Sequence, residues 1–125
     1  MSYFKYEFDS TSGILYKYYF GEITLQDITD SWDESIRDKL IPENTKGFIL
    51  DYRNATFKIS IAEYPEIANY YKRHLEVFGN KRIAILTENP KDVIIPMLVE
   101  EQDEGYESKP FSTLDAATRW VLDGR

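Results

Sequence analysis

The sequence predicts a single α/β domain built on a mixed β-sheet, and three observations lead to this prediction. Its 125 residues are a usual length for one domain, with no linker and no internal repeat. Two alternating segments open the chain. Apolar runs typical of buried strands then alternate with amphipathic helical segments, which implies parallel strands joined by right-handed crossovers. We expect one domain over residues 1–125, with four helices in the order ββαβαβαβα.

Residues 3–8 and 14–20 predict an antiparallel hairpin. In both segments one set of apolar side chains recurs at every second position, as in a strand with one buried face. The turn formers Asp9 to Gly13 lie between the two segments and suit a hairpin loop.

A helix is expected next, with Thr24 as its cap and Asp27 completing the cap three residues later. Its apolar residues recur at spacings of three and four, and Pro42 ends the pattern. They are Leu25, Ile28, Trp32, Ile36 and Leu40.

Residues 47–51 form a short apolar run typical of a buried strand, and a polar loop is expected after it. A helical pattern then extends to Gly79, which suits a C-cap. Its start has two alternatives: Ser60 and Glu63 match a capping box, or an irregular turn precedes a helix that begins near Pro65.

Residues 81–87 predict a further buried strand. Asn89 and Pro90 are typical of a helix start, and Pro96 predicts that this helix is short or kinked. Residues 109–111 suit an edge strand, because proline is tolerated there. A last helix is expected from Leu114.

The composition limits the kinds of molecule that the protein can bind. Acidic residues outnumber basic ones by 22 to 15, so the net charge is −7. A surface of this sign repels nucleic-acid phosphates and the anionic face of a membrane. The chain has no cysteine, which excludes disulfides and thiolate metal sites, and no apolar run long enough to span a bilayer. We expect a cytoplasmic protein that is not an integral membrane protein, binds no nucleic acid and needs no cofactor.

No catalytic or metal-binding constellation is recognisable in the sequence. His74 is the only histidine and flanks an apolar helical face, which is typical of a structural residue. Glycines are scattered singly, so no phosphate-binding loop is predicted. The acidic run at 100–104 lacks the spacing of a calcium loop. We therefore expect no catalytic and no metal-binding residues.

In open α/β sheets, ligands gather where the strands end. Two segments are predicted at this edge, 51–60 after the third strand and 87–90 after the fourth. The candidate residues for binding a partner or ligand are Asp51, Tyr52, Arg53, Asn54, Thr56, Ser60, Thr87 and Asn89. A structural role suits some of them equally, because Ser60 and Asn89 can cap helices while Asp51 and Asn54 can form turns.

Four segments carry a family pattern in their order and spacing. They are Phe48-Ile49-Leu50-Asp51; Ile59-Ser60-Ile61-Ala62; Ile83 to Thr87, followed by Pro90; and Pro110 to Leu122. Together they resemble the STAS domain, the fold of bacterial anti-sigma-factor antagonists, in a divergent SpoIIAA-like form. The resemblance implies a mixed sheet with an N-terminal hairpin, and a non-enzymatic regulatory module that binds a protein partner.

The chain departs from the STAS pattern at the position of its switch. In that family an Asp-Ser-Ser-Gly segment opens a helix, and the second serine is phosphorylated. Ile59, Ser60, Ile61 and Ala62 occupy those four positions here, so an isoleucine stands where the phosphoacceptor is expected. We therefore predict a binding module without the family's serine phosphorylation switch.

Two other functions stay open. STAS-like folds are similar in architecture to lipid carriers, and Pro96 within the apolar segment 93–99 could leave a cavity for a small apolar ligand. An enzyme would need Asp51, Arg53 or His74 to converge in one cleft. The exposed edge of the opening hairpin also allows a homodimer.

Overall fold

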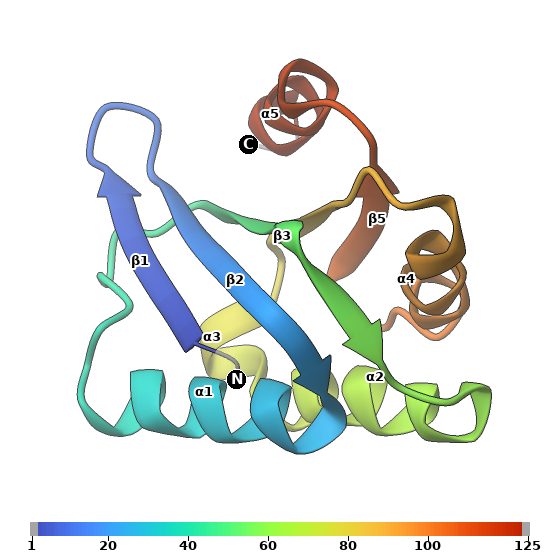
Figure 1. Cartoon of the computed structure of the whole chain (residues 1–125). Coiled ribbons are helices and arrows are strands. Elements are labelled where there is room, and N and C mark those ends of the chain that lie inside the picture. The colour runs from blue at the N-terminus through green and yellow to red at the C-terminus, as the bar shows by residue number, and fades with distance from the viewer. Residues whose placement is uncertain (1–2, 124–125) are drawn as a thin grey trace.

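Five strands form one mixed sheet in the computed structural model, which describes residues 3–123 (Figure 1). The strands are β1 (Tyr3–Asp9), β2 (Ile14–Thr24), β3 (Gly47–Lys58), β4 (Arg82–Leu86) and β5 (Glu107–Phe111). They lie side by side in chain order. β1 and β2 are antiparallel, whereas β2 to β5 are parallel. The predicted α/β class and the opening hairpin are thereby confirmed; residues 1, 2, 124 and 125 of the expected domain lie outside the described residues.

Helices cover both faces of the sheet. They are α1 (Leu25–Arg37), α2 (Tyr64–Arg73), α3 (Leu75–Phe78), α4 (Ile94–Glu100) and α5 (Leu114–Asp123), with two 3₁₀ turns, η1 (Ile61–Glu63) and η2 (Pro90–Val93). Four helices were expected. The number differs because the predicted long helix is divided at His74, whose φ of −125° and ψ of 46° are not helical.

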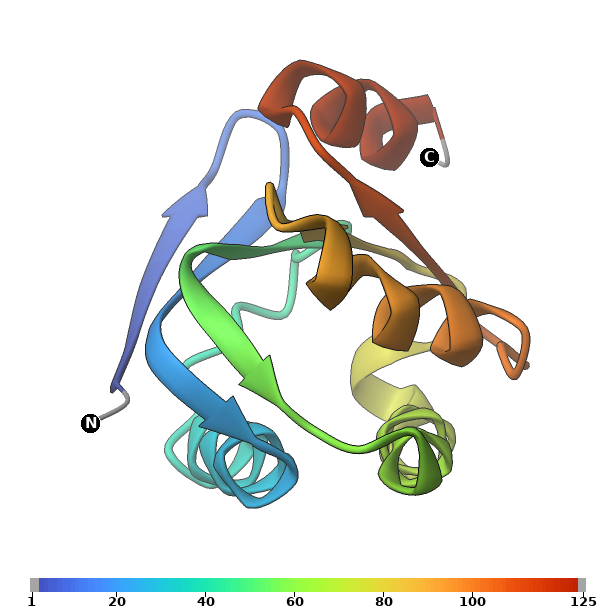
Figure 2. The ribbon, with the colours of Figure 1, turned by 45° about the vertical axis from the view of Figure 1, so that its right-hand side comes forward.

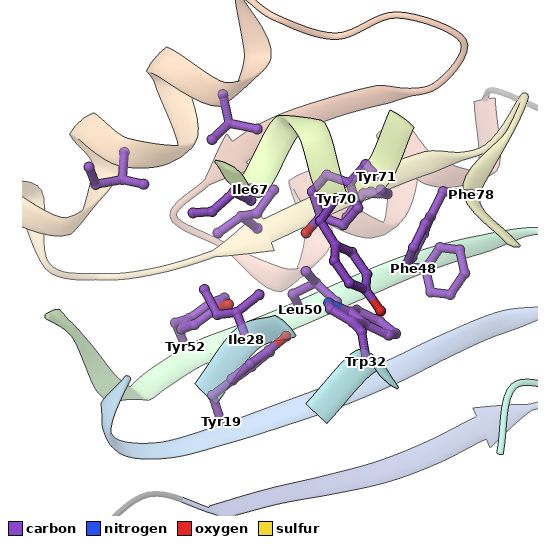
Figure 3. Packing of buried hydrophobic residues seen from close by; sticks show 14 of the residues in the cluster. Tyr19, Ile28, Trp32, Phe48, Leu50, Tyr52, Ile67, Tyr70, Tyr71 and Phe78 are labelled. Atoms are coloured by element: carbon purple, nitrogen blue, oxygen red, sulfur yellow. The ribbon is translucent and has the colours of Figure 1, made fainter. Parts of the chain in front are cut away.

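The two faces carry separate cores. Side chains of α1, α2 and α4 pack with one face of the sheet, and α5 packs with the other, mainly over β3 and β4 (Figures 1 and 2). The larger core is rich in aromatic rings: Trp32, Phe48 and Phe78 contact one another with ring centroids 5.1–5.8 Å apart (Figure 3). These edge-to-face and tilted arrangements are the favoured geometries for aromatic rings.

The predicted polar loop after residue 51 is wrong, because β3 continues to Lys58. The pairing of β2 and β3 shifts at a bulge in β3, where Tyr52 and Arg53 together oppose the single β2 residue between Tyr18 and Phe20. The two strands then run together to Thr24 and Lys58. β4 pairs with β3 only as far as Leu86. The end of β3 therefore projects beyond β4 as a two-stranded ribbon with β2.

The first helix has the predicted N-terminus and a different end. The Thr24 side chain accepts a hydrogen bond from the Asp27 N–H at 3.1 Å, and the Asp27 carboxylate accepts from the Thr24 N–H at 2.9 Å. The helix stops at Arg37, and Lys39 has a φ of 56°. This left-handed residue turns the chain away from the helix, so Leu40 is 45% exposed instead of lying on the buried face.

The predicted signals at the later helices are confirmed locally. Both alternatives for the second helix are observed in part: Ser60 and Glu63 form the capping box, but it opens the short turn η1. α2 then follows with Pro65 in its first turn. Asn89 accepts a hydrogen bond from the Lys91 N–H at 3.2 Å and so caps η2. Pro96 lies within α4, which has seven residues, as its position predicted.

Candidate functional site

The carboxyl ends of β3 and β4 form the edge that the sequence indicated. Asp51 lies opposite Tyr18 of β2 and Leu86 of β4, at the last position where three strands pair. Because side chains alternate along β3, the Asp51 side chain lies on the same face as Ile49. α5 covers this face nearer to the amino ends of the strands. Asp51 is 5% exposed, so its carboxylate is buried at the margin of this core.

Arg53 neutralises the buried Asp51 carboxylate. Its Nη2 lies 2.8 Å from Asp51 Oδ2, and its Nε lies 3.1 and 3.2 Å from the two carboxylate oxygens. The Arg53 backbone N–H also donates to Asp51 Oδ1 at 3.0 Å. Residues two apart on a strand share a face, which is what allows this two-point pairing. The hydrogen bond to Asp51 raises the Arg53 pKa, and the guanidinium stays partly exposed.

Acidic and phenolic groups surround this ion pair. The charge of Glu88 also favours the protonated form of Arg53, although less than Asp51 does. Burial raises the pKa of Tyr18, and the neighbouring charges of Glu7 and Asp51 add to this effect. Tyr18 therefore stays neutral at physiological pH and donates a hydrogen bond to Glu7 at 3.3 Å.

The remaining candidate residues have diverse environments. Tyr52 is only 3% exposed, and its ring stacks on Tyr19 with centroids 4.0 Å apart (Figure 3). Its ring is therefore part of the core and is not presented at the surface. Asn54 is exposed, whereas Thr56 is half-buried opposite Glu22 of β2.

Thr87 and Asn89 hold the loop after β4 in place. Thr87 is 4% exposed, and its N–H donates to the Phe111 carbonyl at 3.0 Å. Its hydroxyl accepts from the Asn89 N–H at 3.4 Å, while Asn89 caps η2. These contacts satisfy both side chains structurally. On β3, Arg53 and Asn54 are the candidate residues with exposed polar side chains, whereas Asp51 is buried.

Ser60 and Ile61 follow β3 directly, at the start of η1. The Ser60 N–H donates to Glu63 Oε1 at 2.9 Å, and its side chain is exposed. Ile61 is 63% exposed, more than any other large hydrophobic side chain among residues 3–123. Single exposed apolar side chains are common on protein surfaces, so Ile61 indicates a contact surface only together with apolar neighbours.

Two further aliphatic side chains are exposed on the neighbouring helix α4: Ile94 is 49% and Met97 53% exposed. Figure 2 shows α4 beside α2, the helix that follows η1. Phe57, near the end of β3, lines one small cavity together with residues of α2 and α4, so these elements adjoin one another. We call Ile61, Ile94 and Met97 the apolar edge. Sequence reasoning missed it, because Ile61 fits the three-and-four spacing of Tyr64 and Ala68, which predicts a buried side chain.

The cavity beside α4 is small. Its volume is about 20 Å³, and it is lined by apolar side chains of β3, α2 and α4, including Ile95, Pro96 and Val99. This is space for roughly one water molecule. The described residues therefore provide no lipid-sized chamber beneath the proline-containing helix.

The three residues that an enzyme would need do not converge. Asp51 and Arg53 lie in the middle of β3, where its pairing with β4 ends, on the face of α5. His74 lies at the end of α2, which runs back along the opposite face, and its Nδ1 is 3.1 Å from Glu76 Oε1. Within residues 3–123, no group of three or more metal-ligating side chains is present. None of the helices described there is long and apolar enough to cross a membrane.

Lys17 is a buried feature that the sequence did not indicate. It lies on β2 with no exposed surface, and four aromatic rings surround its ammonium group. They are Phe4, Tyr6, Tyr19 and Trp32, with ring centroids 3.8–5.5 Å from Nζ. A lysine in an alternating strand is usually expected on the solvent side, so its burial was not predictable from the pattern.

The strand order and the one-sided set of crossover helices define a SpoIIAA-like fold. An anti-sigma factor antagonist from Mycobacterium paratuberculosis is 16% identical in sequence, covering 97% of this chain and 94% of its own, with a TM-score of 0.59. The antagonist SpoIIAA in its unphosphorylated form is 11% identical, covering 98% and 100%, with a TM-score of 0.57. The STAS-like architecture predicted from the sequence is therefore confirmed.

A third solved structure shares this fold more closely in shape. It is an uncharacterized protein of the DUF3478 family from Shewanella loihica with a SpoIIAA-like fold, 17% identical over 96% of this chain and 93% of that one, with a TM-score of 0.63. No protein-family model and no curated protein sequence matches the chain. At these identities the likeness establishes the fold.

Proposed function

We propose that this protein is a non-enzymatic regulatory module that binds a protein partner through the carboxyl-end edge of its sheet, without a serine phosphorylation switch. The cytoplasm is the compartment we expect for this activity. The fold supports the proposal because it is shared with two anti-sigma factor antagonists. Those proteins are regulatory, but the assignment of a partner here depends on this chain's own surface.

The observation that carries the proposal is the 63% exposure of Ile61 at the position where the STAS pattern has its phosphoacceptor. A serine there could acquire about two negative charges on phosphorylation and so repel or attract a partner. Isoleucine cannot be modified in this way. Together with Ile94 and Met97, it gives the edge a contact that is always apolar, which suits constitutive binding.

A polar contact from the face of the sheet opposite α2 and α4 would give the binding its specificity. Arg53 is fixed by Asp51 and keeps part of its guanidinium accessible, so it is preorganised for a carboxylate or carbonyl of the partner. Apolar centres with a polar rim are the usual arrangement in protein interfaces. The small cavity beside α4 does not favour the alternative function of carrying an apolar ligand.

The test is affinity capture from the source cell with three forms of the protein: wild type, an Ile61→Ser/Met97→Ser variant and a Leu114→Ser control. Leu114 is 38% exposed on α5, on the other face of the sheet. We expect a specific partner that is recovered with wild type and control and lost with the edge variant. Recovery of the same proteins with all three forms would contradict the assigned surface.

The absence of a phosphorylation switch needs its own measurement. Intact mass of the protein purified from its source cells is expected to show no phosphate, and Ser60→Ala is expected to leave partner capture unchanged. A phosphate on Ser60 that abolished capture would overturn this part of the proposal and leave the binding surface standing.

A further inference from the structure

The outer edge of β1 is an unpaired strand edge. β1 is the first strand in the sheet order and pairs only with β2 among the described strands, and Figure 2 shows it at the margin of the molecule. A strand edge presents a row of backbone donors and acceptors to any strand of matching shape. A charged side chain on an edge strand disfavours pairing unless an opposite charge lies across from it, and Lys5 is such a charge on β1.

The sequence of β1 is complementary to itself about Tyr6. We propose that the protein forms a symmetric homodimer in which β1 pairs antiparallel with β1 of a second copy, with Tyr6 on the two-fold axis. In this register Lys5 lies opposite Glu7 of the second copy, and Glu7 lies opposite its Lys5. Phe4 lies opposite Phe8, and Tyr3 opposite Asp9.

The register follows from geometry and charge. When two copies of β1 pair antiparallel within one continuous sheet, directly opposite residues point to the same face. Odd-numbered residues therefore lie opposite odd-numbered ones, and even-numbered opposite even-numbered. Centring on Tyr6 pairs all seven residues of β1. Centring on Lys5 would place two lysines in contact, and centring on Glu7 would place two glutamates in contact. Like charges directly opposite are destabilising and opposite charges are stabilising, so one register is selected.

Burial along β1 supports the same pairing. Tyr3, Lys5 and Glu7 are exposed on one face, so the two cross-strand ion pairs would lie together at the surface. Phe4 and Phe8 are partly buried against the larger core on the other face, where a second copy would extend the layer.

An exposed aliphatic side chain also lies at this edge. Leu40 is 45% exposed and lines a cleft of about 100 Å³ with Phe4 and Tyr6. Ser31, Glu34 and Ser35 complete the lining of this cleft, and a second copy paired along β1 would lie beside it. The proposed dimer is independent of the partner-binding edge, because β1 lies on the far side of the sheet from β4.

A charge exchange tests the proposed register. Lys5→Glu places two pairs of glutamates opposite each other, and Glu7→Lys places two pairs of lysines opposite each other. We expect wild type to show a monomer–dimer equilibrium by analytical ultracentrifugation at micromolar concentration. Each single variant is expected to weaken dimerisation at least tenfold, and Lys5→Glu/Glu7→Lys is expected to restore it. Circular dichroism checks that each variant is folded.

Mixing the two single variants provides the sharper result. Lys5→Glu and Glu7→Lys chains restore both opposite-charge pairs when they meet, so they are expected to form a heterodimer although neither dimerises alone. A wild type that stays monomeric at all concentrations, or a dimer insensitive to the three charge variants, would overturn the proposal. Neither outcome bears on partner capture through Ile61 and Met97.

Discussion

Lys17 Nζ donates a hydrogen bond to Ser31 Oγ across a distance of 2.5 Å, in the interior between β2 and α1. The Lys17 ammonium group has three N–H donors, and the Ser31 hydroxyl accepts only one of them. Aromatic rings surround the rest of the group. Burial lowers the pKa of the Lys17 amine well below its ordinary range, and the charge of Glu34 opposes this effect only in part. Lys17 is therefore a destabilising group whose contribution depends on pH.

Replacing Lys17 by methionine is expected to stabilise the protein at pH 7 by about 1–3 kcal/mol, because an imperfectly satisfied ionisable group leaves the core. The unfolded chain binds a proton at Lys17 up to about pH 10.5, whereas the folded chain releases it at lower pH. Stability of the wild type should thus rise with pH through this window, and Lys17→Met should lose that rise. Urea unfolding at pH 6, 7.5 and 9 checks both effects.

The matched control for Lys17 is Lys58→Met, which changes an exposed lysine paired loosely with Glu22. Its stability difference from wild type should be nearly constant with pH. If Lys17→Met also gave a constant difference, Lys17 would not be the source of the pH dependence.

The Asp51–Arg53 pair is expected to stabilise the projecting end of β3. Arg53→Met leaves the buried Asp51 carboxylate with fewer donors and should lower the free energy of unfolding by about 1–3 kcal/mol. Asp51→Asn/Arg53→Met should be less destabilised than the sum of the single changes. The control is Arg37→Met, whose pair with Asp38 is exposed and should give no measurable change. Equal losses for Arg37 and Arg53 would contradict a special role for this pair.

Gly47 is expected to be required for close packing of α5 on β3. A Cβ atom added at Gly47 would collide with Cγ1 of Val121 and lie 3.3 Å from the Arg82 carbonyl oxygen. Gly47→Ala should therefore cost about 1–3 kcal/mol of stability. Val121→Ala in the same chain should recover part of that loss, measured by urea unfolding. Strict additivity of the two changes would show that α5 does not make this contact.

Lipid uptake is expected to be absent. The cavity beside α4 holds about 20 Å³, which is roughly the space of one water and far below that of an acyl chain. Native mass spectrometry after incubation with phospholipid and fatty acid should give the mass of the bare chain. A stable one-to-one lipid adduct would show that α4 opens to a larger chamber and would favour the carrier function instead.

Local signals in the sequence predicted the parts of the fold that local interactions decide. Thr24 with Asp27 and Asn89 with Lys91 form caps within a few residues of chain, and these caps are observed. The hairpin turn before Ile14 is another local element. The predicted α/β class needed only the order of these elements and the handedness of crossovers.

Tertiary pairing decided the parts that the sequence could not supply. The projecting half of β3 contains polar residues such as Arg53 and Asn54, and it is a strand because the second half of β2 pairs with it beyond the bulge in β3. The polar pattern alone therefore indicated a loop. The burial of Lys17 has the same origin, since α1 covers a strand position that alternation does not mark as special.

The place of the candidate residues in the fold was predictable, whereas their contacts were not. Asp51 and Arg53 lie where the third and fourth strands stop pairing, as expected, but their mutual pairing requires that both lie on one face of a strand. Tyr52 was expected beside them, and the same alternation turns it into the core. The exposure of Ile94 depends on which face of α4 meets α2, which the sequence does not specify.

The affinity of the captured partner for the purified protein tests the central claim most directly. Isothermal titration would compare wild type, Ser60→Ala and Ile61→Glu, since a carboxylate at position 61 places charge in the proposed apolar contact. We expect unchanged affinity for Ser60→Ala and at least about tenfold weaker binding for Ile61→Glu, with both variants folded. Equal affinity of Ile61→Glu and wild type would contradict binding through this edge.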